Sequence, residues 1–194
     1  MSYYAKPLVI AVLSTIVQWF AVMSLLGADP PESAEVNVPF RLSSQNNIVV
    51  RATLNEEDSL SLMLHTAVSD LMLTEEAVRR TNTIQFSDSI KMKSWGGEAN
   101  SRVSKANQLQ MGTLVFTGID IFEDNNSGMG TDGKFGLDLF QNRIVEINFD
   151  SQNIILYDSL PQQAEQFERI KIVNQGGMLL VQGTCSIDDD KLQL

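Results

Sequence analysis

Two kinds of reactive side chain are almost absent from this sequence of 194 residues, which has one cysteine, Cys185, and one histidine, His65. A single cysteine cannot form a disulfide within the chain. Without a CxxC pair or a second histidine, the usual ligands of a zinc site are also missing. We therefore interpret Cys185 as a small, half-buried strand residue rather than a reactive thiol. The sequence predicts no metal site and no cofactor.

Basic residues are also few. The chain has 14 lysines and arginines against 24 aspartates and glutamates, which gives a net charge of −10. The only adjacent basic pair is Arg79–Arg80. Because binding to nucleic acid depends on clustered lysine and arginine, this distribution excludes nucleic acid as the expected partner. The acidic balance instead favours solubility.

A long apolar run occurs once, from Leu8 to Leu26, after Lys6 and before the helix-breaking stretch GADPPES. It predicts an N-terminal apolar helix, with two interpretations. Residues 1–28 are a cleaved signal peptide, for which Ala28 suits the cleavage site and Leu26 does not, or they are a retained membrane anchor of close to the required length of about 20 residues. Both interpretations predict export, with residues 29–35 as a linker.

After this linker, apolar and polar residues alternate with a period of two, which is typical of β-strands. Asn47–Leu54 and Ser59–His65 form an expected hairpin around the turn Asn55–Asp58. Thr74 is expected to cap a short helix that begins with two glutamates. The other expected elements are strands at 83–86 and 89–93, a glycine turn at 95–101, one or two strands in 108–122, a short helix after Gly136, a hairpin over 143–158, and strands at 167–173 and 178–187. This pattern predicts a mainly β fold, a closed barrel with one or two short helices.

The polar stretch Glu123–Gly133 contains Asp124, Asn126 and Asp132 and invites comparison with a calcium-binding loop. An EF-hand loop requires a glutamate at its twelfth position, where this chain has Phe135. We therefore interpret the stretch as a solvated loop.

The order of these elements resembles that of the retropepsin-like aspartic proteases, in the exported bacterial branch that often has two lobes. The resemblance covers residues 36–158 and is most specific in DGKFGLDLFQNRIVEINFDSQNIILYD, where Gly133 and Gly136 are the structural glycines and Lys134 stands where an apolar residue is usual. It places Trp95, Gly96 and Gly97 at the flap. The polar composition of 159–166 predicts a linker, and the resemblance implies that 167–194 is the opening hairpin of an incomplete second lobe.

The family's catalytic loop is Asp-Thr-Gly, and this chain has His65-Thr66-Ala67 there. In the family, the aspartate shares a proton with a twin from a second lobe, because two adjacent carboxylates cannot both ionise, and the pair activates a water molecule. An imidazole cannot reproduce this carboxyl pair. Asp70 and Asp138 lie outside the loop, so the resemblance implies a lobe with no intact catalytic residue.

Three interpretations of His65 remain open. In the first, it is a former catalytic position that has lost its function and makes local hydrogen bonds only. In the second, it marks a ligand groove whose affinity changes near pH 6. In the third, two copies of the chain bring their His65 rings together around a metal. Thr66 either keeps the hydrogen bonds between lobes or is a simple turn residue.

Three functions follow from the resemblance. The first is a pseudoprotease that binds an extended peptide or protein without cutting it, since strand addition needs no aspartate. The second is the degenerate half of an active endopeptidase whose competent aspartate lies in another lobe or chain. The third is a structural or dimerisation module of the cell envelope. In each case we expect a location in the periplasm or cell envelope of a bacterium, pairing with a second copy or lobe, and membrane anchoring through Leu8–Leu26 if that segment is retained.

Overall fold

The computed structural model describes residues 35–94, 97–124, 129–175, 178–187 and 190–193. The contacts divide the chain into two units, Met1–Ser33 and Ala34–Leu194. The described residues belong to the second unit, so the expected helix at Leu8–Leu26 lies outside them. The strands of the main sheet are β1 (Glu35–Leu42), β2 (Ile48–Leu54), β3 (Asp58–Leu64), β4 (Leu71–Leu73), β5 (Asp88–Ser94), β6 (Gly97–Met111), β7 (Leu114–Glu123), β8 (Gly133–Phe135), β9 (Ile144–Asn148) and β10 (Asn153–Tyr157).

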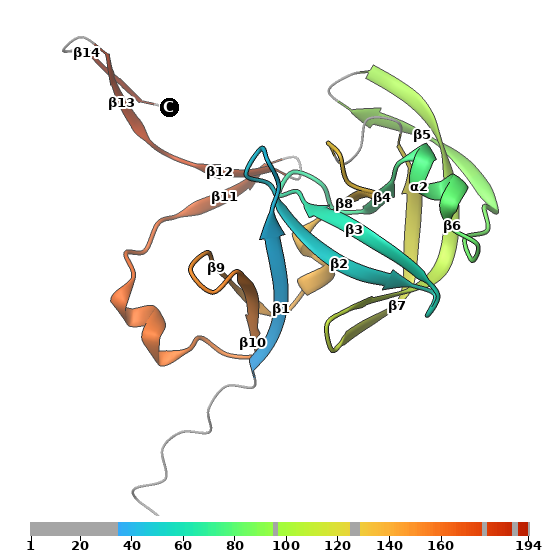
Figure 1. The fold of residues 1–194 in the computed structure, drawn as a ribbon. Coiled ribbons are helices and arrows are strands. Elements are labelled where there is room, and N and C mark those ends of the chain that lie inside the picture. The colour runs from blue at the N-terminus through green and yellow to red at the C-terminus, as the bar shows by residue number, and fades with distance from the viewer. Residues whose placement is uncertain (1–34, 95–96, 125–128, 176–177, 188–189, 194) are drawn as a thin grey trace, which may run out of the picture. The chain divides into compact units, whose positions relative to one another are not determined.

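These ten strands form one sheet in the order β5-β6-β7-β4-β8-β3-β2-β1-β10-β9. An additional pairing of Thr53 and Leu54 with Gln110 and Leu109 joins β2 to β6. The sheet therefore closes on itself through β2, β3, β8, β4, β7 and β6, and the remaining strands extend from this six-stranded barrel (Figure 1). The predicted mainly β fold with a closed barrel is confirmed.

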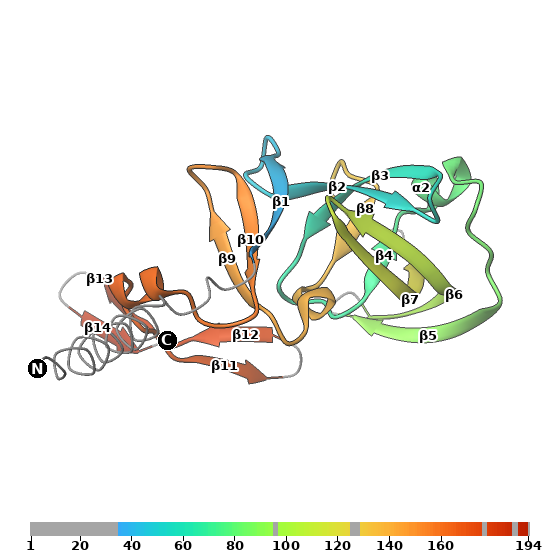
Figure 2. The same cartoon turned by 90° about the horizontal axis from the view of Figure 1, so that it is seen from below.

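Strand β8 lies between two strands that are close together in sequence. It pairs in parallel with β3, where Leu64 is opposite Phe135, and antiparallel with β4, where Leu73 is opposite Gly133. The chain thus leaves β3, passes through residues 65–70 and enters β4, and the gap between the two strands is filled by a segment some sixty residues later in the sequence. Figure 2 shows β8 between these neighbours from a second direction.

The interior of the barrel follows the alternation seen in the sequence. Val50, Ala52 and Leu54 of β2 are at most 4% exposed, and Leu60 and Leu62 of β3 are at most 2% exposed. Phe135 of β8 is fully buried among them. Because each inward side chain is followed by an outward one, the opposite faces of these strands carry the residues that lie outside the barrel.

The segment between the helix and the first long hairpin differs from its prediction. Residues 83–86 pair with no strand, and β5 begins only at Asp88. Asp58 explains this course, because its carboxylate accepts hydrogen bonds from the backbone N–H groups of Asn82 and Thr83 and from the Thr83 hydroxyl. These bonds take the place of a strand ladder. The expected turn at 95–101 is also shorter, since Gly97 already pairs with Ser94 at the start of β6.

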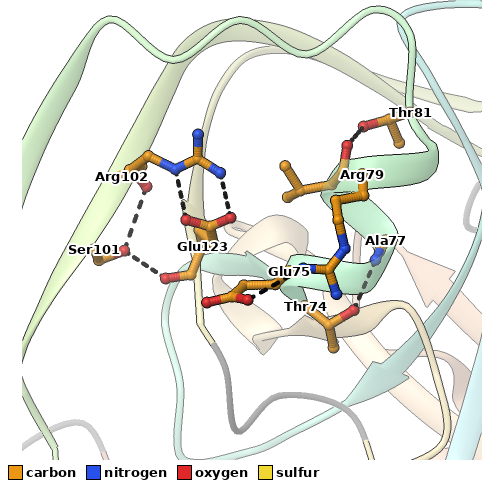
Figure 3. Close-up of polar contacts among 9 residues, drawn as sticks. Thr74, Glu75, Ala77, Arg79, Thr81, Ser101, Arg102 and Glu123 are labelled. Carbon is orange, nitrogen blue, oxygen red and sulfur yellow. Dashed lines mark hydrogen bonds and ion pairs between the residues drawn. The ribbon is translucent and has the colours of Figure 1, made fainter.

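Helix α2 (Glu75–Arg80) is confirmed with its expected cap. The Thr74 hydroxyl accepts a hydrogen bond of 3.0 Å from the backbone N–H of Ala77, and Glu75 forms an ion pair with Arg79 one turn later (Figure 3). This is the expected N-cap geometry, in which a side-chain oxygen satisfies one of the free N–H groups of the first turn.

Replacing Thr74 by alanine removes this acceptor and is expected to lower the free energy of unfolding by about 1 kcal/mol. Urea denaturation followed by circular dichroism measures the change. Thr117→Ala, at an exposed position of β7, serves as a control and should change stability by no more than about 0.5 kcal/mol. Equal midpoints for the Thr74→Ala protein and the natural chain would show that the cap contributes nothing.

Beyond β10 the structure differs from the expected linker and strands. Residues 159–166 contain a short 3-10 helix, η2 (Gln162–Gln166). Earlier in the chain, the short helix expected after Gly136 is also a 3-10 helix, η1 (Leu137–Phe140). The strand expected at 178–187 is two strands, β12 (Met178–Val181) and β13 (Thr184–Ile187), which pair with β11 (Ile172–Gln175) and β14 (Asp190–Gln193) respectively. Cys185 lies on β13. The domain boundaries at 158 and 167 stay a prediction.

Candidate functional site

The loop His65-Thr66-Ala67 begins where β3 ends, beside β8. The backbone N–H of His65 donates a 2.9 Å hydrogen bond to the Phe135 carbonyl oxygen and continues the β3–β8 ladder by one residue. The chain then turns, with Thr66 and Ala67 exposed and His65 half-buried. The loop is therefore an open turn at the end of a buried strand, with the imidazole as its least exposed side chain.

The His65 ring is held by its own loop. Its Nδ1 atom accepts a 3.2 Å hydrogen bond from the backbone N–H of Ala67. An imidazole that accepts at Nδ1 carries its proton at Nε2 when it is neutral. Burial, and after it the nearby Lys134 ammonium, lower the pKa of His65 from its ordinary value of 6.5, so the ring is neutral at pH 7. The neutral ring therefore has an N–H donor at Nε2.

Two glycines bring the backbone of β8 against this loop and against β4. A Cβ atom on Gly136 would overlap the carbonyl oxygen of Val68, and one on Gly133 would overlap the carbonyl oxygen of Met72. Both overlaps are with backbone atoms, so a side chain at either position would force the strand or the loop to move. These are the two glycines that the resemblance identifies as structural.

A second group of titratable residues lies near the other end of the same loop. Burial raises the pKa of Asp70, and the neighbouring carboxylates of Asp138 and Asp120 raise it further. Asp70 immediately precedes the β4–β7 pairing of Leu71 with Ile121, and Asp120 precedes its partner in the same way. Sequence reasoning considered Asp70 and Asp138 separately. It missed Asp120, because nothing local indicates that β4 and β7 are parallel neighbours.

The residues expected at the flap are only partly described. Trp95 and Gly96 lie outside the described residues, while Gly97 is the first residue of β6. Strands β5 and β6 pair from Asp88–Val103 to Ser94–Gly97 and so form a long hairpin around the two undescribed residues. At its base, Arg102 forms hydrogen bonds of 2.7 and 2.5 Å with Glu123 (Figure 3). Its guanidinium carbon lies 4.2 Å from the centroid of the Phe86 ring.

Both aspartates of the expected solvated loop are bound to cations of the chain itself. The Lys134 ammonium is 3.0 Å from Asp124, and Arg80 forms an ion pair with Asp132. Within the described ranges, no group of three or more histidine, cysteine, aspartate or glutamate residues could hold a metal ion. The same part of the chain contains no helix that is long and apolar enough to cross a membrane.

A separate hollow of about 450 Å³ lies beside helix α2. Its lining includes Glu75, Arg79, Arg80 and Asp132, and it does not include the His65 loop. Asp132 joins its own segment to β3, because its side chain and its backbone both form hydrogen bonds with the backbone of Ser61. The hollow is polar, and four of its charged residues form two ion pairs, Glu75 with Arg79 and Asp132 with Arg80.

Comparisons with known proteins give structural similarity only. No protein-family model matches the sequence, and no curated protein matches it. The structure is similar to a retropepsin-like aspartic protease from Rickettsia conorii, with 18% identity, a TM-score of 0.45, and coverage of 64% of this chain and 91% of that one. It is also similar to EIAV protease complexed with the inhibitor HBY-793, with 12% identity, a TM-score of 0.42, and coverage of 52% and 91% respectively.

Proposed function

We propose that this chain is an exported, retropepsin-like pseudoprotease, which binds an extended peptide or a partner strand and does not cut it. The observation that carries the proposal is the His65 ring. The resemblance places this ring at the position of the expected acid. Its pKa is lowered, so that it is neutral at pH 7, and its Nδ1 accepts a hydrogen bond from the N–H of Ala67 in its own loop. The loop lies at the end of a barrel strand, as the resemblance implies, but it presents an imidazole in place of a carboxylate.

Peptide hydrolysis in this family requires two carboxyl groups that share one proton and activate water. The neutral His65 ring has a donor at Nε2, and the charge that acts on it is the cationic Lys134. The raised pKa of Asp70 comes from burial and from two other carboxylates, Asp138 and Asp120. The catalytic position therefore lacks its acid, and the nearby carboxylates belong to a different cluster.

Binding without cleavage needs an accessible strand edge and a surface that receives side chains. Strand β5 lies at one end of the ten-stranded sheet, so one of its edges has no partner strand within that sheet. Its residues Asp88, Ser89, Ile90 and Lys91 are exposed. An extended peptide that adds to this edge would gain main-chain hydrogen bonds and lie along the β5–β6 hairpin.

The location and the assembly are parts of the same proposal. Export is supported by the apolar run Leu8–Leu26 and the helix-breaking residues after it, with cleavage or anchoring as its two outcomes. Pairing with a second copy or a second lobe is supported by the resemblance, in which two loops meet across one groove. The proposed location is the periplasm or cell envelope of a bacterium.

The decisive experiment restores the acid. Full-length protein in mild detergent is incubated with an unfolded protein substrate from pH 3 to 7, as the natural chain, as His65→Asp/Ala67→Gly, and as the matched control His65→Asn/Ala67→Gly. We expect pepstatin-sensitive cleavage from the aspartate variant alone, because asparagine resembles aspartate in shape but cannot share a proton.

The possible results separate the three functions. Cleavage gained only with aspartate supports an intact groove that has lost its acid, and a more than linear dependence on protein concentration would show that two copies form the pair. Pepstatin-sensitive cleavage by the natural chain would overturn the proposal. Absence of cleavage by all three proteins would favour the structural role in the envelope.

A further inference from the structure

One lysine lies in an otherwise apolar row on the outside of the barrel. Paired residues of neighbouring strands share a face of the sheet, so the pairings can be followed from strand to strand. The row that contains Lys134, called the outer row below, consists of Val49 on β2, Met63 on β3, Lys134 on β8, Met72 on β4, Phe122 on β7 and Val103 on β6. The residues next along these strands, such as Leu62, Leu73 and Phe135, fill the interior.

Burying the Lys134 ammonium at this position is energetically unfavourable. Its strand neighbours Met63 and Met72 are 6% and 8% exposed, and the lysine side chain itself is 15% exposed. A third methionine would continue the row without placing a charge there. An ammonium group in apolar surroundings is unfavourable unless it is paired. The ion pair with Asp124 offsets part of this cost.

The ion pair leaves capacity for a further acceptor. An ammonium group has three N–H donors, and Asp124 accepts from it with one oxygen at 3.0 Å. Among the described residues, Asp124 is the one side chain that is hydrogen-bonded to this ammonium. A carboxylate from a ligand would therefore meet a partly buried cation, which favours charge-assisted hydrogen bonds.

His65 adds a second donor near this cation. It lies one residue past the end of β3, and its N–H bonds to the carbonyl oxygen of Phe135, the residue after Lys134. The Lys134 ammonium is close enough to affect the ring. With Nδ1 occupied by the N–H of Ala67, the donor of the neutral ring is Nε2–H. The cation and this donor are both complementary to a carboxylate, and the donor belongs to the residue that stands where the resemblance places the family's acid.

We propose that the Lys134 ammonium and the His65 Nε2–H select extended ligands that present a carboxylate side chain to this face of the barrel. This inference rests on the proposed function, since it specifies the class of peptide that the chain binds; the selecting groups are on β8 and in the His65 loop, not on the β5 edge. The selection applies to one carboxylate of the ligand, close to Lys134. Asp70, Asp120 and Asp138 lie by the far end of the His65 loop, and they would repel a second acidic group of the ligand there, as would the net charge of −10.

The test uses two pools of fluorescein-labelled octapeptides built from apolar and β-branched residues, one with a central glutamate and one with a central glutamine. Fluorescence anisotropy measures their binding to the full-length chain in mild detergent at about 0.15 M salt, where long-range repulsion is screened beyond roughly 8 Å. We expect the glutamate pool to bind about tenfold more tightly, as one charge-assisted contact suggests.

The variant Lys134→Met/Asp124→Asn removes both charges of the ion pair and so leaves no single buried charge behind. We expect it to bind both pools within about twofold of each other. Lys134→Gln serves as a second variant if the first unfolds, as judged by its melting temperature. Lys171→Met, which removes an exposed lysine outside the ten-stranded sheet, should keep the preference.

The outcomes distinguish the inference from the proposal beneath it. Equal binding of the two pools by the natural chain, or a preference that persists in the folded Lys134 variants, would overturn the selectivity and leave peptide binding in place. Absence of binding to either pool would overturn peptide binding itself, and the selectivity with it.

Discussion

Replacing Gly136 by alanine is expected to lower the free energy of unfolding by about 4 kcal/mol, which is at the upper end of single-residue effects. The added Cβ would overlap the carbonyl oxygen of Val68, and the Cα of Ser69 is also close. These are backbone atoms, so no change of rotamer relieves the overlap. Either β8 moves away from the His65 loop or the loop itself is displaced. Gly133→Ala, which meets the carbonyl oxygen of Met72, should behave similarly.

Urea denaturation followed by tryptophan fluorescence and circular dichroism measures both variants. Gly183→Ala is the matched control, because a Cβ there has no atom within 4 Å and its backbone is not in the left-handed region. We expect this control to stay within about 0.5 kcal/mol of the natural chain. If Gly136→Ala unfolded at the same urea concentration as the control, the result would contradict the close packing of Gly136 against the loop at Val68.

The second large effect is expected at Asp58, whose replacement by alanine should cost about 3 kcal/mol. Asp58 is 7% exposed, and its carboxylate organises the segment that follows helix α2. It accepts hydrogen bonds from the N–H groups of Asn82 and Thr83 and a 2.6 Å bond from the Thr83 hydroxyl. Alanine leaves these donors without their acceptor. Urea denaturation measures the loss, and Asp150→Ala at an exposed turn position provides the comparison.

The same carboxylate gives stability a defined dependence on pH. Burial raises the pKa of Asp58, but the hydrogen bonds from Thr83 and Asn82 outweigh it, and the net effect lowers the pKa from its ordinary value of 3.8. A lowered pKa in the folded state stabilises the protein above the unfolded-state value. That contribution is lost as the pH falls below 3.8 and through the folded-state pKa.

Comparison with Asp58→Asn isolates this contribution from that of the other carboxylates. Unfolding free energies measured from pH 6 down to pH 3 should differ most between the two proteins at the upper end of the range. The difference should narrow below about pH 4. A difference that stays constant over the whole range would show that ionised Asp58 has no special role in the fold.

The sequence predicted those elements whose signals are local. The hairpin of β2 and β3 follows from alternation on either side of the turn at Asn55–Asp58, and helix α2 follows from Thr74 and two glutamates in its first turn. The segment 83–86 was predicted wrongly as a strand. It alternates like one, but its backbone is bound by Asp58, and no local pattern reveals that a carboxylate 24 or 25 residues earlier supplies the acceptor.

The candidate site was predictable in part for the same reason. His65, Thr66 and Ala67 were found by comparison with a known motif, whereas the environment of the ring depends on β8 and β7. The proximity of Lys134 to His65 requires the parallel pairing of β3 with β8, and the grouping of Asp70 with Asp120 requires the parallel pairing of β4 with β7. Alternation indicates which residues share a face of one strand, but it does not indicate which strand lies beside it.

The position of β8 also has a consequence for how the chain acquires its structure. Strands β3 and β4 lie within sixteen residues of each other in sequence, yet each is paired with Gly133–Phe135. Until that segment arrives, the barrel wall is open at its centre, with the ladders of both strands incomplete. Pairings between distant segments slow folding, because the loop between them must close first. The barrel is therefore expected to close late in folding, once Gly133–Phe135 has joined β3 and β4.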